Sequence, residues 1–110
     1  MKLVIIGGDA AGMSCASKLR RLNENIEIKV FEKTRVVSYS ACGIPYYIGG
    51  EFDDWRDMIV RTPEEFRESN IQVVLNHEVV KVNVEEKFIC TTWDKCKQAR
   101  ENIVRYFEWR

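Results

Sequence analysis

Apolar runs of strand length alternate with a helical pattern in the first part of the chain. Residues 2–6 form an apolar run that ends at Gly7-Gly8, and a second run covers residues 26–31 and ends in Glu32. Between them, apolar residues recur at helical spacing, at Ala11, Cys15, Leu19 and Leu22. A strand, a helix and a strand within about thirty residues predict a βαβ unit with parallel strands.

The rest of the chain predicts short helices and further strands. Residues 38–50 fit a short helix between loops, and residues 62–65 (Thr-Pro-Glu-Glu) have the pattern of a capping box that begins a helix. Residues 71–75 fit a third strand, and residues 80–90 alternate and turn like a β-hairpin. The tail from residue 93 fits a helix or a strand, and we favour a strand over residues 103–109. The fold class is therefore α/β, a Rossmann-like βαβ parallel sheet with an added β-hairpin.

Composition is that of a soluble globular domain. The chain has 110 residues, 45% of them hydrophobic and 31% charged, with a formal net charge of zero. This balance argues against a nucleic-acid partner, and the apolar runs are too short to span a membrane. The N-terminus has no signal-peptide pattern, so we expect a cytoplasmic protein. The four cysteines have no metal-site spacing, and we expect no metal site.

The turn after the first strand has the pattern of a dinucleotide-binding site. Gly7 allows a tight turn, Gly12 lets the helix and the strand pack closely, and the helix N-terminus offers N–H groups to a pyrophosphate. Glu32 ends the second strand, where a carboxylate can accept hydrogen bonds from ribose. Asp9 stands where the second fingerprint glycine is expected, and its charge opposes a phosphate. A glycine turn that only packs a βαβ unit is the alternative; we favour nucleotide binding.

Cys42 lies in the stretch 38–47, Ser-Tyr-Ser-Ala-Cys-Gly-Ile-Pro-Tyr-Tyr. Pro45 is tolerated only near a helix beginning, so we expect Cys42 in or just before a first turn. The helix dipole there favours the thiolate, a nucleophile toward disulfides and peroxides, and Gly43 would leave room for a flat ring or a thiol. The alternative is a small apolar cysteine at a helix start. Cys15, on the apolar helix face, is expected to be inert core.

Taken together, these stretches resemble a known family. The opening Gly-Gly-Asp-Ala-Ala-Gly-Met-Ser, the strand end Phe-Glu-Lys, the Cys42 stretch and Arg-Thr-Pro-Glu-Glu-Phe at 61–66 are similar to one branch of the flavin-dependent pyridine nucleotide-disulfide oxidoreductases. That branch contains the coenzyme A-disulfide reductases and NADH oxidases, and the resemblance covers about residues 1–90. It implies FAD as the cofactor. The residues it implies as FAD contacts are Gly7, Ala11, Gly12, Glu32 and Lys33.

The resemblance also implies a thiol chemistry and a substrate. Tyr47 occupies the position of the second cysteine of dithiol members, so Cys42 would be the single catalytic thiol. Its oxidised state would be a mixed disulfide with coenzyme A or a sulfenic acid. Ser38 and Arg21 match positions that contact coenzyme A or its disulfide, whereas a lysine of some members has no counterpart near Asn70.

Family members are several hundred residues long and add an NAD(P)H domain and a dimerisation domain. We therefore expect residues 1–110 to form one truncated FAD domain, with a divergent tail over 91–110 and no activity alone. NAD(P)H would bind only with the missing domain. A nucleotide or coenzyme A binding module without turnover, or a self-associating remnant, are the alternatives. The edge of the first strand lacks its usual neighbour, and we favour a homodimer over a tail that covers this edge.

Overall fold

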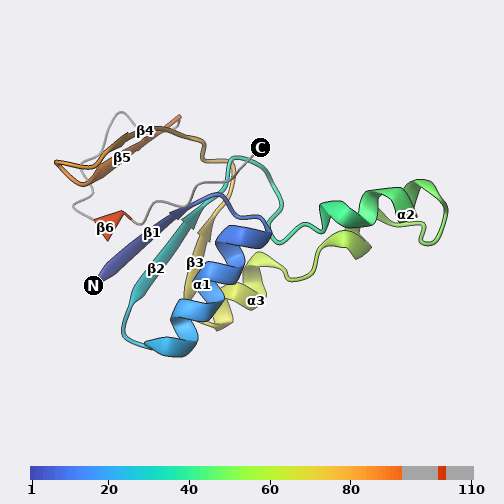
Figure 1. Cartoon of the computed structure of the whole chain (residues 1–110), viewed down its shortest axis with the longest axis horizontal. Helices are drawn as coiled ribbons and strands as arrows, with labels where there is room; N and C mark the ends of the chain where they lie inside the picture. The colour runs from blue at the N-terminus through green and yellow to red at the C-terminus, as the bar shows by residue number, and fades with distance from the viewer. Residues whose placement is uncertain (93–101, 104–110) are drawn as a thin grey trace.

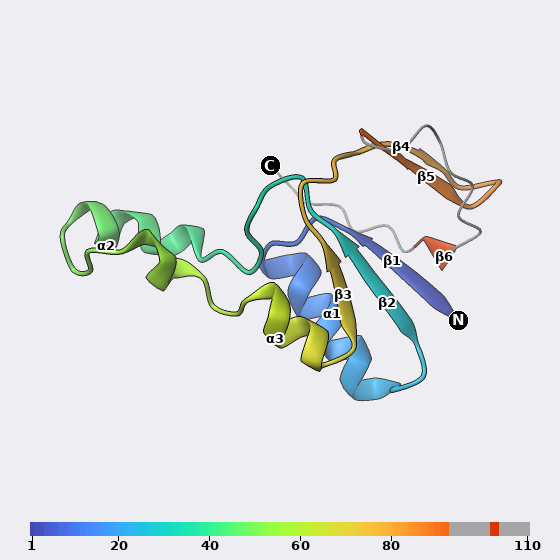
Figure 2. The same cartoon turned by 180° about the vertical axis from the view of Figure 1, so that it is seen from behind.

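The computed structural model describes residues 1–92 and 102–103. A parallel sheet lies at its centre, in the order β3-β2-β1-β6. Its strands are β1 (Lys2–Ile6), β2 (Glu27–Phe31), β3 (Ile71–Val74) and β6 (Asn102–Ile103). Helices α1 (Ala10–Leu22) and α3 (Pro63–Glu68) lie together along the sheet (Figure 1). The hairpin of β4 (Val79–Asn83) and β5 (Phe88–Thr91) lies on the side away from them (Figure 2). The predicted α/β fold with an added hairpin is confirmed.

The apolar runs become strands because a parallel sheet covered by helices buries its central residues. Val4 and Ile5 of β1 and Ile28 and Val30 of β2 are each at most 1% exposed. Parallel pairing runs the whole length of β1 and β2, from Lys2 opposite Glu27 to Ile6 opposite Phe31. The β1 and β2 strands therefore end side by side, and the loops that follow them meet at one edge of the sheet.

Helix α1 presents a slightly different face to the sheet than the apolar spacing predicts. Its buried residues are Gly12, Met13 and Ala16, while Leu22 is 68% exposed. Cys15 is only partly buried, against the edge of the core. The prediction that Leu22 shares the buried face is wrong: Leu22 is the last residue of α1 and is exposed, while the small residues Gly12 and Ala16 face the sheet. Small residues such as Gly12 and Ala16 do not stand out in an apolar pattern, although they are buried.

Helix α3 begins as its sequence predicts. The Thr62 side chain accepts a hydrogen bond from the Glu65 backbone N–H at 3.3 Å, and the Glu65 carboxylate accepts one from the Thr62 N–H at 2.7 Å. This second hydrogen bond is the main cause that lowers the pKa of Glu65 below its usual 4.5. The capping box therefore fixes the start of α3 and, with it, the position of Phe66 in the core.

Residues 41–58 form an arm that extends away from the sheet (Figures 1 and 2). The arm consists of a 3₁₀ turn η1 (Ala41–Gly43), a short helix α2 (Ile44–Ile48) and a second 3₁₀ turn η2 (Trp55–Met58). Its apolar side chains are largely exposed, Ile48 to 78%. The short helix predicted within 38–50 is confirmed.

Strand β6 lies beside β1, on the edge for which the sequence analysis weighs a second copy of the chain against the chain's own tail. Asn102 and Ile103 pair in parallel with Leu3 and Val4. The tail therefore lies beside β1 at these two positions. The homodimer stays a prediction. Beyond residue 103, the strand predicted over 103–109 lies outside the described residues. Within the described part of the chain, no helix has the length and apolar character needed to cross a bilayer.

Candidate dinucleotide and thiol site

The turn between β1 and α1 depends on two glycines. Gly7 has a φ of +99°, a backbone conformation that side-chain-bearing residues rarely adopt. A Cβ added to Gly12 would lie 1.9 Å from the Gly7 carbonyl oxygen, so only glycine lets α1 start this close to β1. Both predicted roles of these glycines are confirmed by the geometry.

Gly8 has a role that the sequence analysis missed. A Cβ at this position would lie 2.6 Å from Val37 Cγ1 and 3.1 Å from the Cβ of Glu32. Its N–H donates a 2.7 Å hydrogen bond to Glu32 Oε2. The Gly7-Gly8 pair is evident in the sequence, but the role of Gly8 is not, because the residues that Gly8 contacts lie more than twenty positions away.

Glu32 lies where the sequence predicts it, at the carboxyl end of β2 beside the glycine turn. It is 8% exposed, and its two oxygens accept hydrogen bonds from the N–H groups of Gly8 and Thr34, at 2.7 and 2.8 Å. Each carboxylate oxygen retains a further lone pair. The carboxylate therefore fixes the loop and keeps the capacity to accept a ligand hydroxyl.

Two cavities flank Glu32 at the carboxyl end of the sheet, where open α/β sheets bind ligands. One, of about 390 Å³, is lined by Asp9, Glu32, Lys33, Thr34, Val36 and Tyr39. The other, of about 270 Å³, is lined by Ile6, Gly7, Phe31, Glu32, Lys33, His77, Glu78 and Val79. Lys33 is exposed and lines both, whereas Ala11 is half-buried in the first turn of α1 and lines neither.

Asp9 occupies the N-cap position of α1, but its side chain makes no capping hydrogen bond. Its Oδ1 is buried and has no hydrogen-bond partner among the described residues. The carboxylate therefore lies at the helix end that would otherwise attract a phosphate. This position agrees with the sequence-based expectation that the negative charge of Asp9 opposes a phosphate.

Cys42 is an exposed free thiol in η1, directly before α2. Pro45 lies in the first turn of α2, as predicted. The Ser40 hydroxyl oxygen is 3.1 Å from Cys42 Sγ, a contact that the sequence analysis did not foresee. The open space predicted at Gly43 is wrong, because a Cβ there would lie 3.2 Å from Met58 Cγ. The glycine instead lets η1 pack against η2.

Cys15 differs from Cys42 in its surroundings. It packs against the core from α1, and burial raises the pKa of its thiol above the usual 9.0. Since the thiolate is the reactive form, this agrees with the expectation that Cys15 is unreactive. Cys90 is part of a disulfide.

Ser38 and Arg21, the two predicted coenzyme A contacts, lie in different places. Ser38 has a φ of +53°, and its N–H donates to the Gly8 carbonyl at 2.8 Å, which ties the base of the arm to the glycine turn. Arg21 is exposed and lines a third cavity, which borders α1 and α3. The lining of that cavity, within the described residues, includes neither Ser38 nor Cys42.

Comparisons with known proteins agree on one family. The family described as pyridine nucleotide-disulphide oxidoreductase matches residues 1–105. A coenzyme A disulfide reductase of Staphylococcus epidermidis is 42% identical over 101 residues, covering 91% of this chain and 23% of the relative. The corresponding protein of Staphylococcus haemolyticus is 38% identical over 89 residues, covering 80% and 20%. The chain thus spans about a quarter or less of the length of these curated relatives.

Solved structures give the same result. The reduced CoADR-RHD of Bacillus anthracis has a TM-score of 0.78 and 42% identity, and the match covers 82% of this chain and 16% of that one. The water-forming NADH oxidase of Lactobacillus brevis has the same TM-score at 27% identity, with coverage of 83% and 20%. With the glycine turn and Glu32 in place, these matches show that the chain belongs to the pyridine nucleotide-disulphide oxidoreductase family.

Proposed function

We propose that this chain is the FAD-binding portion of a flavin-dependent NAD(P)H:disulfide oxidoreductase of the coenzyme A-disulfide reductase or NADH oxidase type. Cys42 is its single redox-active thiol, and the 110 residues alone do not turn over NADH. The observation that carries the proposal is the link between the two halves of the site. The arm that bears Cys42 is anchored by Ser38 to Gly8, and Gly8 is bonded to Glu32.

The residues around the glycine turn fit the cofactor in most respects. Gly7 and Gly12 allow a close approach to the first turn of α1, where the N–H groups of Ala11 and its neighbours lack intrahelical partners. Glu32 would accept the ribose hydroxyls, and the exposed Lys33 would lie beside them. When bound, FAD supplies a two-electron carrier between a nicotinamide and a disulfide. The charge of Asp9, at the start of α1, opposes the fit.

The thiol step requires only Cys42 and the adjacent Ser40. The Cys42 thiolate attacks one sulfur of coenzyme A disulfide, a new S–S bond forms at Sγ, and the second coenzyme A leaves as a thiolate with the electron pair of the broken bond. The Ser40 hydroxyl, 3.1 Å from Sγ, is placed to donate a hydrogen bond to the thiolate. With tyrosine at position 47, no second arm cysteine competes for the mixed disulfide.

FAD binding tests the cofactor half of the proposal, and Asp9 gives a variant that should improve it. We expect Asp9→Asn to tighten FAD binding by about fivefold, because it removes a negative charge near the pyrophosphate position and breaks no capping hydrogen bond. Quenching of FAD fluorescence during titration measures the affinity. Asp53→Asn, an exposed change in the arm, is the matched control and should bind like the parent. An absence of FAD binding by parent and variant alike would contradict the proposal.

We also propose that the chain forms homodimers. The exposed apolar side chains of the arm, including Tyr46 and Ile48, support this, as does the short length of β6, which pairs with only two residues of β1. Light scattering after size-exclusion chromatography should give twice the mass of one chain. A monomeric mass at high micromolar concentration would refute the homodimer.

A further inference from the structure

Ser40 begins the 3₁₀ turn η1, and its side chain lies next to the sulfur of Cys42. Ser40 is the N-cap residue of η1, a position at which a serine commonly accepts a hydrogen bond from the backbone. Here its side chain makes no capping hydrogen bond, and its hydroxyl oxygen lies 3.1 Å from Cys42 Sγ. The serine is half-buried, whereas the thiol is exposed. The hydroxyl is therefore available to the sulfur and is not used to cap the turn.

The backbone of Ser40 is fixed on both sides, which holds the hydroxyl near the sulfur. The Ser40 N–H donates to the Met58 carbonyl at 2.8 Å, and the Ser40 carbonyl accepts from the Gly43 N–H at 2.9 Å. Met58 is 4% exposed, and its Sδ accepts a hydrogen bond from the Tyr39 hydroxyl at 3.7 Å. Ser40 and Cys42 are thus held together in one short turn. Their contact forms within the chain itself and needs no ligand.

The backbone donors that follow Cys42 are already used. The Gly43 N–H donates to the Ser40 carbonyl, and the Ile44 N–H donates to the Ala41 carbonyl. Helix α2 has only five residues, so few peptide dipoles add up behind the sulfur. Within the described part of the chain, the Ser40 hydroxyl is the one hydrogen-bond partner of Cys42 Sγ. A direct hydrogen bond to the thiolate therefore comes from this hydroxyl.

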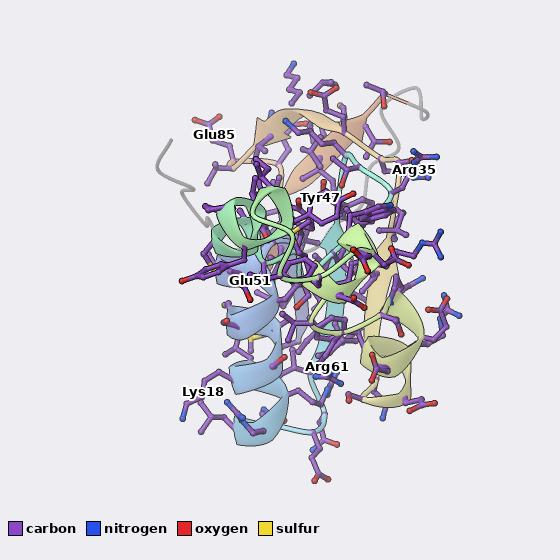
Figure 3. The ribbon with its side chains drawn as sticks, turned by 90° about the vertical axis from the view of Figure 1, so that its right-hand side faces the viewer. Lys18, Arg35, Tyr47, Glu51, Arg61 and Glu85 are labelled. Atoms are coloured by element: carbon purple, nitrogen blue, oxygen red, sulfur yellow. The ribbon has the colours of Figure 1, made fainter. Side chains whose placement is uncertain are left out.

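The titratable side chains of the two elements next to η1 keep their charge through the neutral range. On η2, Asp57 is exposed and Arg56 pairs with the N-cap residue Asp54 at 3.5 Å. On α2, Tyr46 and Tyr47 are exposed, and Figure 3 looks onto this end of the arm, where Tyr47 is labelled. Tyrosine ionises near pH 10, and aspartate and arginine keep their charges between pH 6 and 9. A change in reactivity within that range therefore reports the thiol.

A hydrogen bond from Ser40 acts differently on the two forms of Cys42. In the thiol form, either atom can be the donor, and the contact joins two neutral groups. In the thiolate form, the hydroxyl donates to a full negative charge, and such charge-assisted hydrogen bonds are about twice as strong. The bond therefore favours the thiolate. It also makes each thiolate a weaker nucleophile, because nucleophilicity falls as the thiolate is stabilised.

We infer that Ser40 is a positioning residue that holds Cys42 as a thiolate in the chain without any cofactor, and that it thereby increases the thiolate fraction while it lowers the reactivity of each thiolate. The inference rests on the proposed reaction of Cys42 and deepens it, because it names the residue that prepares the thiol before a substrate binds. Near neutral pH the larger thiolate fraction dominates the rate. At alkaline pH, where most of the thiol is ionised in any case, the lower reactivity dominates.

The pH profile of Cys42 alkylation by iodoacetamide, in which the thiolate displaces iodide, tests this inference. The rate at Cys42 is read by peptide mass spectrometry between pH 6 and 9. Relative to the parent, we expect Ser40→Ala to react about threefold more slowly at pH 7 and about twofold faster at pH 9. The reason is an about tenfold loss of thiolate, offset by an about threefold gain in the reactivity of each thiolate. Ser40→Thr keeps the hydroxyl and should restore the parent profile. Ser14→Ala removes an exposed hydroxyl on α1 and, as the matched control, should follow the parent.

Two results would overturn the inference. A Ser40→Ala profile equal to that of the parent would show that the hydroxyl does not stabilise the thiolate. A slower reaction at every pH would show that Ser40 only supports the turn. If Ser40→Ala fails to fold, Ser40→Thr and Ser40→Val, which have the same shape and differ in the hydroxyl, give the same comparison.

The reagent also separates this inference from the proposed function, because iodoacetamide requires no binding site for coenzyme A. Profiles of parent and Ser40→Ala that cross, without any coenzyme A adduct at Cys42, would support the role of Ser40 and refute the proposed reaction. An adduct that forms in both proteins, with profiles that do not cross, would support the reaction and refute the role of Ser40.

Discussion

Replacing Gly12 by alanine should lower the free energy of unfolding by at least about 3 kcal/mol, a large share of the stability of a small domain. The added Cβ would lie 1.9 Å from the Gly7 carbonyl oxygen, which belongs to backbone and cannot rotate away as a side chain can. Either α1 moves off β1 or the Gly7 turn opens. Urea unfolding followed by circular dichroism measures the change.

A matched control lies on the same helix. Ser14 is exposed on α1, so Ser14→Ala should change the unfolding free energy by no more than about 0.5 kcal/mol. A Gly12→Ala protein within about 1 kcal/mol of the parent would show that the close contact between helix and strand is not needed for the fold.

Replacing Cys42 by serine should strongly slow formation of the mixed disulfide with coenzyme A. The parent chain, mixed with coenzyme A disulfide, should gain one coenzyme A moiety and release one thiolate per chain, and should not consume added NADH. Cys42→Ser should react at least about tenfold more slowly, because Cys15, the other free thiol among the described residues, is partly buried and burial raises its pKa. Intact-mass spectrometry and steady-state NADH absorbance measure the two effects.

Cys15→Ser is the control for this reaction and should form the adduct like the parent. Peptide mapping then identifies the modified cysteine. An adduct on Cys15 in preference to Cys42 would refute the assignment of the reactive thiol, and robust NADH consumption by the chain would refute its dependence on further domains.

The order of elements could be predicted because local patterns determine it. The apolar runs at 2–6 and 26–31 have the length of buried strands, and the glycines after the first run indicate the turn. Thr62 and Glu65 predict a helix start, because the hydrogen bonds of a capping box involve only four consecutive residues. Strand β6 was the least predictable element, because a two-residue strand carries no periodicity and its pairing depends on where β1 lies.

Site residues could be predicted most securely where the role depends on a property that a single residue type has. Gly7 and Gly12 belong to this group, since their roles follow from backbone conformation and from the absence of a Cβ. The hydrogen bond between Gly8 and Glu32 joins residues 24 positions apart and could not be predicted from either residue alone. Gly43 was misinterpreted for the same reason, because Met58 reaches it from the far end of the arm.

Cys42 and Cys15, the free thiols among the described residues, lie on parts of the chain with different attachments to the core. Cys42 lies on the arm, whose base is held by a few backbone hydrogen bonds such as that from Ser40 to Met58, at 2.8 Å. Cys15 is partly buried on α1 and packs against the core, so its thiol becomes fully accessible when the helix separates from the sheet. Labelling of the exposed Cys42 would thus proceed in the folded chain, whereas the labelling rate of Cys15 in low denaturant would report the separation of α1 from the sheet. Damage to the chemistry and damage to the fold can therefore be distinguished in a single sample.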